Sequence, residues 1–225
     1  MGGILTVNAA TMSASPDTTP PDALLLIANG CPHCPTVLQG LSELVKTGHI
    51  GRLEVVNIGV HPEIAQTHGA RAVPWLRLGP FVLTGLQAPA ELAHWAERAQ
   101  SSAAINDYVR ERLADGDLAA VLAMLQHAPQ QASALVHWLG DPQAELQVRL
   151  GAAAVLEHLE GSETLASLID ALTTLTRHAD PRIRMDAVYA LGLTHRAEVR
   201  PILAALREDA DAEVRETVHD SLLAL

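Results

Sequence analysis

Hydrophobic residues in the first 100 positions occur in short runs between turns, which predicts a small sheet with covering helices. Residues 23–28 (ALLLIA) form a continuous apolar run, as expected for a strand buried on both faces. Further strands are predicted over residues 53–58, 74–78 and 81–83. Helical spacing predicts helices over residues 31–47, 62–68 and 89–100. The predicted order of elements is therefore β-α-β-α-β-β-α.

The rest of the chain follows an almost continuous helical pattern and contains an internal repeat. Residues 180–191 align with residues 211–222 at a spacing of 31 residues, and a looser copy surrounds Arg149. Helix pairs of this size cannot bury their own apolar stripe, so the copies are expected to stack. The repeated Asp is expected to act as helix N-cap, and the repeated Arg to bond an Asp of the neighbouring repeat. Second helices are predicted over about residues 163–176 and 198–207, and divergent or capping helices over residues 105–113, 118–125 and 132–139.

The change of pattern near residue 100 predicts a mixed domain over residues 22–100 and a helical domain over residues 101–225. A flexible polar segment over residues 1–21 is expected to precede them. The net charge is −11, and residues 101–225 contribute 10 basic and 19 acidic side chains, which argues against a nucleic-acid partner. No stretch reads as a signal peptide or a membrane span, so a cytoplasmic protein without a membrane partner is expected.

The two cysteines of the chain are separated by two residues, at the predicted junction of the first strand and the first helix. Backbone N–H groups at a helix N-terminus favour the thiolate of Cys31, which is the predicted attacking thiol. Cys34 is the predicted resolving thiol, because the two-residue spacing lets it reach a mixed disulfide on Cys31. Pro32 and His33 are expected to modulate the pair, His33 by adding positive charge when it is protonated. The alternatives are an inert buried pair, or a soft metal such as Cu(I) held by Cys31, His33 and Cys34.

Metal chemistry elsewhere has little support in the sequence. A structural zinc site needs four ligands, and the chain has no second cysteine pair. The histidines of the helical half share no common spacing, so no metal site is expected among them. His61 and His68 flank the helix predicted over residues 62–68 and are expected to be solvated or capping.

A second signal is the sequence Ala72-Val73-Pro74-Trp75, in which Pro74 lies 43 residues after Cys31 at the start of a predicted strand. Proline cannot donate a ladder hydrogen bond, so an edge strand or a cis peptide bond is implied. Trp75 is expected either to line a substrate groove or to pack in the core.

The strand–CxxC–helix order and the later Val-Pro resemble the thioredoxin-fold disulfide oxidoreductases, over about residues 22–100. The order of segments is similar to that of glutaredoxin-like domains. It consists of the run from Cys31 to Leu41, a strand, the sequence PEIAQTHGARAVPWL, a hairpin and a helix. Those domains occur in archaeal protein disulfide oxidoreductases and in the flavoprotein subunit of alkyl hydroperoxide reductase. The resemblance implies that Pro74 is cis and faces the disulfide, and that Val73 pairs with substrate backbone. The dipeptide Pro32-His33 instead matches the strongly oxidising periplasmic disulfide-forming enzymes, whose large helical insertion is absent here.

The repeat Asp-x-x-Val-Arg-x-x-Ala-x-x-Ala-Leu resembles HEAT repeats, particularly the short bacterial type of phycobilin-lyase-like proteins, over residues 145–225. The expected fold is thus an α/β thioredoxin-like domain followed by an all-α HEAT-like repeat domain.

The combined prediction is a thiol–disulfide oxidoreductase that acts on a protein disulfide or dithiol through Cys31 and Cys34. No cofactor is expected besides the redox-active disulfide, which an upstream reductant or oxidant would recycle, and the helical domain is expected to dock a protein partner. Two alternatives remain: an interaction or scaffold protein with a redox-responsive latch, and a dithiol oxidant, which Pro32-His33 favours. The reduction potential separates these alternatives.

Overall fold

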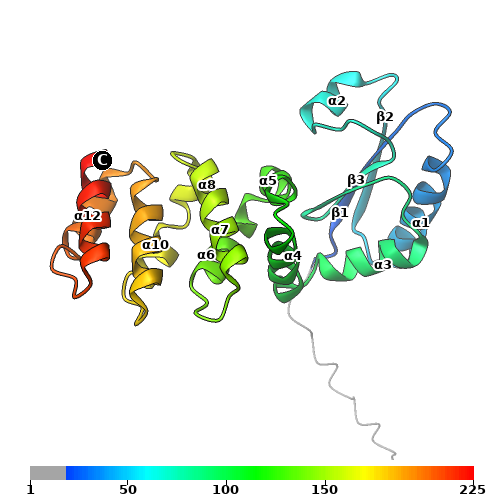
Figure 1. The fold of residues 1–225 in the computed structure, drawn as a ribbon. Helices are drawn as coiled ribbons and strands as arrows, with labels where there is room; N and C mark the ends of the chain where they lie inside the picture. The colour runs from blue at the N-terminus through cyan, green and yellow to red at the C-terminus, as the bar shows by residue number, and fades with distance from the viewer. Residues whose placement is uncertain (1–18) are drawn as a thin grey trace, which may run out of the picture.

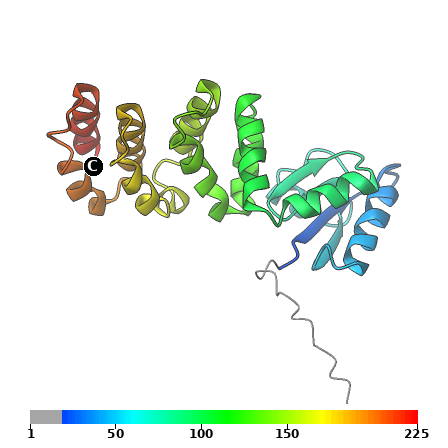
Figure 2. The same ribbon diagram turned by 90° about the horizontal axis from the view of Figure 1, so that it is seen from below.

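The protein is described by a computed structural model over residues 19–225 (Figure 1). The expected flexible segment, residues 1–21, lies outside the described residues except for its last three positions. The described chain has a mixed α/β domain, from which a row of helices extends to one side (Figures 1 and 2). No helix within the described range is long and apolar enough to cross a bilayer.

The sheet has four strands in the order β2-β1-β3-β4. They are β1 (Asp22–Ile27), β2 (Arg52–Asn57), β3 (Trp75–Leu78) and β4 (Phe81–Thr84). β1 runs parallel to β2 and antiparallel to β3, and β3 forms a hairpin with β4. The four central residues of β1 are buried, so the prediction of a strand covered on both faces is confirmed.

Three helices cover this sheet: α1 (Cys34–Lys46), α2 (Pro62–Thr67) and α3 (Pro89–Arg98). α1 and α3 bury Leu41 and Leu92 together with Leu25 and Leu76 of the sheet. A Cβ on Gly40 would lie 2.7 Å from Leu92 Cδ1, so this glycine allows the two helices to pack closely. The opposite face of the sheet, with Leu24, Leu26 and Trp75, packs against residues of α2 and the loop after it.

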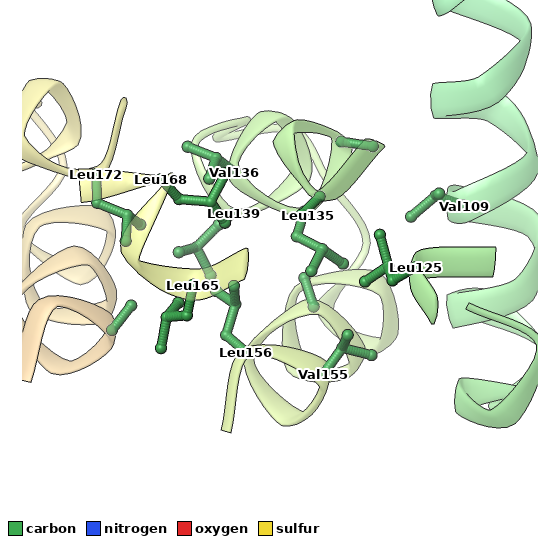
Figure 3. Close-up of a cluster of buried hydrophobic side chains, with 14 of the residues drawn as sticks. Val109, Leu125, Leu135, Val136, Leu139, Val155, Leu156, Leu165, Leu168 and Leu172 are labelled. Carbon is green, nitrogen blue, oxygen red and sulfur yellow. The ribbon is translucent and has the colours of Figure 1, made fainter. Parts of the chain in front are cut away.

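The helical domain follows directly. Its elements are α4 (Ser102–Ala114), α5 (Leu118–His127), η1 (Pro129–Ala132), α6 (Ser133–Leu139), α7 (Leu146–His158), α8 (Glu163–Ala166), α9 (Ile169–Leu175), α10 (Pro181–Gly192), η2 (Ala197–Val199), α11 (Arg200–Ala204) and α12 (Ala212–Ala224). Leucine and valine side chains of α4 to α9 point toward one another in a continuous core (Figure 3). Burial of such an apolar stripe between neighbouring helix pairs is what stabilises a stack of repeats.

In the helical domain, two predicted helices differ from the structure. The single helix predicted over residues 163–176 is two, α8 and α9. The Ser167 hydroxyl donates a hydrogen bond to the Thr164 carbonyl at the break and so competes with the helical backbone pattern. The helix predicted over residues 198–207 is confined to η2 and the short α11. Pro201 lies in the first turn of α11, where the missing N–H is tolerated.

The two domains share a buried aromatic contact. The Phe81 ring of β4 lies 4.8 Å from Tyr108 of α4 and 5.0 Å from Trp95 of α3, measured between ring centroids. The Arg98 guanidinium lies 5.0 Å from the Trp95 ring centroid and closes one side of this group. Phe81 belongs to the same buried cluster as the helical core, so the domains are packed together.

Candidate functional site

The Cys-x-x-Cys segment lies between the C-terminal end of β1 and the first turn of α1. The helix begins at Cys34, with His33 as N-cap residue, and not at Cys31 as the periodicity predicted. Cys31 precedes Pro32, and a residue before proline is restricted toward extended backbone. Cys31 therefore lies just outside the helix, in front of its N-terminus.

Cys31 and Cys34 form a disulfide bond with a Cα–Cα distance of 5.6 Å. The two sulfurs are not equivalent in their surroundings. Cys34 is 5% exposed, whereas Cys31 is only partly buried. The Cys34 backbone N–H donates to Cys31 Sγ at 3.2 Å. The same N–H is placed to stabilise a thiolate on Cys31 in the reduced protein, because charge-assisted hydrogen bonds to a sulfur anion favour its charged form.

Pro32 and His33, the residues predicted to modulate the pair, are both exposed between the cysteines. The His33 side chain makes no capping hydrogen bond to the helix. With both sulfurs in the disulfide, Cys31 and Cys34 present no thiolate to a metal ion in this state.

The predicted groove residues lie at the same end of the sheet as the disulfide. The Val73–Pro74 peptide bond is cis. Trp75 pairs with Leu26 near the end of β1, so Val73 and Pro74 lie at the edge of the sheet from which the cysteine loop emerges. Of the two explanations that the sequence offered for Pro74, an edge strand or a cis peptide bond, the first does not apply, because Pro74 precedes β3, which is an interior strand. Their role in binding a substrate backbone stays a prediction.

Trp75 is 3% exposed and packs in the core with Leu24 and Leu26. Of the two expected positions, in a substrate groove or in the core, the structure shows the second. Its ring contacts His68 and His127, with centroid distances of 5.3 and 6.1 Å. His68 is the C-cap residue of α2, with its backbone N–H donating to the Ile64 carbonyl, so the predicted capping position is confirmed. Its side chain is partly buried beside Trp75 and is not fully solvated.

Two further features had no signal in the sequence. His127 of α5 reaches across the domain junction to His68, with ring centroids 5.0 Å apart. A cavity also lies between α10 and α12, lined by Tyr189 and His195 among others. Within residues 19–225, no group of three or more His, Cys, Asp or Glu residues is placed to hold a metal ion.

The repeat motif has a regular geometry. Arg184 Nη1 donates to the carbonyls of His178 and Ala179. Arg215, 31 positions later in the chain, donates in the same way to the carbonyls of Asp209 and Ala210. Asp180 and Asp211 accept hydrogen bonds from the first turns of α10 and α12, so the predicted N-caps are present.

Comparison with known protein families matches residues 134–223 to HEAT repeats. The prediction of HEAT repeats in the C-terminal region is therefore confirmed, and such repeats are protein-interaction modules with extended binding surfaces. No curated protein matches the chain. The N-terminal mixed sheet with its helices is compatible with the expected thioredoxin-like arrangement.

Proposed function

We propose that this protein is a thiol–disulfide oxidoreductase of thioredoxin-like fold, in which the HEAT repeats dock a protein partner. The observation that carries the proposal is the asymmetry of the cysteine pair. Cys31 is the more exposed of the two cysteines, and its sulfur accepts a hydrogen bond from the Cys34 backbone N–H at 3.2 Å, while Cys34 is buried at the start of α1. An accessible, stabilised sulfur beside a buried partner suits an attacking and a resolving thiol.

The reaction begins from the reduced dithiol. The Cys31 thiolate attacks one sulfur of a substrate disulfide, a mixed disulfide forms, and the other substrate sulfur leaves as a thiolate that takes up a proton. Cys34, as thiolate, then attacks Cys31 Sγ. The mixed disulfide breaks, the second substrate thiol leaves, and the Cys31–Cys34 disulfide forms. Two electrons pass from the protein to its substrate, and an external dithiol reductant restores the starting state.

Insulin reduction in the presence of dithiothreitol tests this proposal. The wild-type protein should accelerate the precipitation of insulin B chains, and Cys31→Ser should reduce the rate to that of dithiothreitol alone. Cys34→Ser is the matched variant. It retains the attacking thiol. Reduced beforehand and mixed with insulin after dithiothreitol has been removed, it should accumulate a mixed disulfide with insulin, visible on a non-reducing gel. Equal rates for wild type and Cys31→Ser would refute the proposed chemistry.

The reduction potential of the pair distinguishes the proposal from its alternatives. Equilibration with glutathione or dithiothreitol buffers, followed by thiol quantification, gives this value. A potential near that of thioredoxin, about −270 mV, fits a reductant, whereas one near −120 mV fits a dithiol oxidant. A potential below about −300 mV indicates a structural bond, and would favour a scaffold protein over an enzyme.

A further inference from the structure

A cavity of about 340 Å³ lies between α10 and α12, which pack side by side at the end of the helical row farthest from the sheet (Figure 1). Its lining includes Glu160, Tyr189, Leu193, His195, Asp220 and Ala224. A Cβ on Gly192 would lie 2.9 Å from Ser221 Cβ, so the two helices are in contact at this point of the lining. The volume falls within the range of small-ligand sites and is large enough for one long side chain.

The polar side of the cavity is acidic. Glu160 and Asp220 belong to the lining, and Glu157 accepts a hydrogen bond from the Tyr189 hydroxyl at 3.1 Å. The described residues of the lining include neither Lys nor Arg, and His195 is their one basic group. Burial, the hydrogen bond to Glu157 and the nearby carboxylates of Glu157 and Glu160 raise the pKa of Tyr189, consistent with a negative potential here.

His195 is held in place beside one of these carboxylates. Among the described residues it is the one non-glycine residue with positive φ, at 52°. This left-handed backbone is unfavourable for a residue with a Cβ, and it places Nε2 2.7 Å from Glu160 Oε1. The hydrogen bond orients Glu160 at the cavity.

The rest of the lining combines apolar and aromatic surface with the small hydroxyl residues Thr217 and Ser221. Leu193 and Ala224 offer aliphatic surface, and the Tyr189 side chain, with its residue 43% exposed, leaves part of its ring accessible. An arginine side chain matches this combination, since its aliphatic stem packs on apolar surface while its planar head stacks on aromatic rings. The guanidinium also forms paired hydrogen bonds with carboxylates, a geometry that the lysine ammonium does not match.

We propose that the cavity between α10 and α12 binds an arginine side chain presented by a basic segment of the protein partner. The inference deepens the docking role of the HEAT repeats proposed above and rests on it. The charge of the domain supports it, since residues 101–225 carry 19 acidic and 10 basic side chains and attract a basic partner over a distance.

Fluorescence polarisation tests the proposal with a labelled, acetylated and amidated peptide of three Arg-Gly pairs as probe. The wild-type chain should bind this peptide, and should bind the matched Lys-Gly peptide several-fold more weakly. The double variant Glu160→Gln/Asp220→Asn should weaken binding of the arginine peptide by roughly tenfold or more, since charge-assisted hydrogen bonds are lost. Circular dichroism verifies that the variant is folded.

The double variant Glu208→Gln/Glu216→Gln is the control, because it removes the same charge from exposed positions of the same domain outside the cavity lining. It should keep the affinity within about twofold, as expected for screened surface charges. No binding by the wild type, equal binding of the lysine peptide, or equal losses in the two double variants would overturn the proposal. Cys31→Ser should bind the peptide as tightly as the wild type, so that failure of docking and failure of the redox chemistry are measured separately.

Discussion

At the scale of single residues, the fold brings the rings of His68 and His127 together, and their surroundings change the pKa of both. Burial lowers the pKa of His68, and the Arg77 guanidinium lowers it further, while Glu54 acts in the opposite direction. Burial also lowers the pKa of His127, and His68 and Arg77 add to this effect. His68 Nδ1 is buried without a hydrogen-bond partner among the described residues. The structure therefore favours both rings in the neutral form.

The free energy of unfolding should consequently fall as the pH falls below about 6.5, the ordinary value for histidine. Below that pH the unfolded chain binds protons that the folded protein resists, so the contribution of these rings is complete above 6.5 and lost as the pH decreases. Urea unfolding at pH 7.5 and 5.5 measures the effect. The double variant His68→Gln/His127→Gln should lose less free energy of unfolding between pH 7.5 and pH 5.5 than the wild type does. A control variant with the exposed residues His94 and His158 changed to Gln should lose as much free energy of unfolding between the two pH values as the wild type. If His68→Gln/His127→Gln also lost as much as the wild type, these two rings would not be the source of the pH dependence.

At the scale of the elements, the repeated arginines connect one helix pair to the next. Arg149 of α7 bonds Asp186 of α10 at 2.5 Å. Arg184 of α10 donates from Nε and Nη2 to the two carboxylate oxygens of Asp209, which precedes α12. The expected Arg–Asp bonds between repeats are present, but their carboxylates come from Asp186 and Asp209 and not from the N-cap aspartates. The N-cap carboxylates face the first turns of their own helices, which leaves other aspartates to bind the arginines.

Asp209→Ala should destabilise the helical domain by about 3 kcal/mol, because it leaves the Arg184 charge largely buried without its partner. The two side chains are only 14% and 8% exposed, so solvent screens their interaction weakly. The same pairing lowers the pKa of Asp209, and its contribution is present at neutral pH. The midpoint of urea unfolding measures the loss. Asp107→Ala, at an exposed position of α4, should change the midpoint little. Equal effects of the two substitutions would show that the Arg184–Asp209 pair does not stabilise the contact between repeats.

At the scale of the whole molecule, the aromatic contact at Phe81 connects the stability of the two domains. Tyr108 is 6% exposed, and its ring lies 5.9 Å from Trp95 and 4.8 Å from Phe81. A contact of these rings, which joins a strand and a helix of the first domain to a helix of the second, predicts that both domains unfold together.

Differential scanning calorimetry should therefore show one transition for the wild type and two for Tyr108→Ala. The substitution removes the shared ring and should reduce the stability by about 3 kcal/mol, as large-to-small core changes do. Tyr189→Ala, which truncates a tyrosine that is 43% exposed in the helical domain, should retain a single transition. A single cooperative transition in Tyr108→Ala would show that the coupling has another source.

The order and type of most elements, the Cys-x-x-Cys at the strand–helix junction and the register of the repeats followed from the sequence by itself. These features depend on residues near one another in the chain, such as the apolar run of β1 or the capping Asp180 and Asp211. Errors occurred where a local hydrogen bond interrupts a periodic pattern, as at Ser167, and where a helix ends before its pattern does, as α11 does at Ala204.

Only the tertiary structure decided which distant side chains meet. Trp75 had two expected positions, and its burial was settled by the packing of α2 and α5 against the sheet. The contact between His68 and His127, the group around Phe81 and Tyr108, and the cavity between Glu160 and Asp220 each join elements far apart in the chain. Their positions depend on how finished elements pack against one another, and hydrophobic periodicity carries no information about that packing.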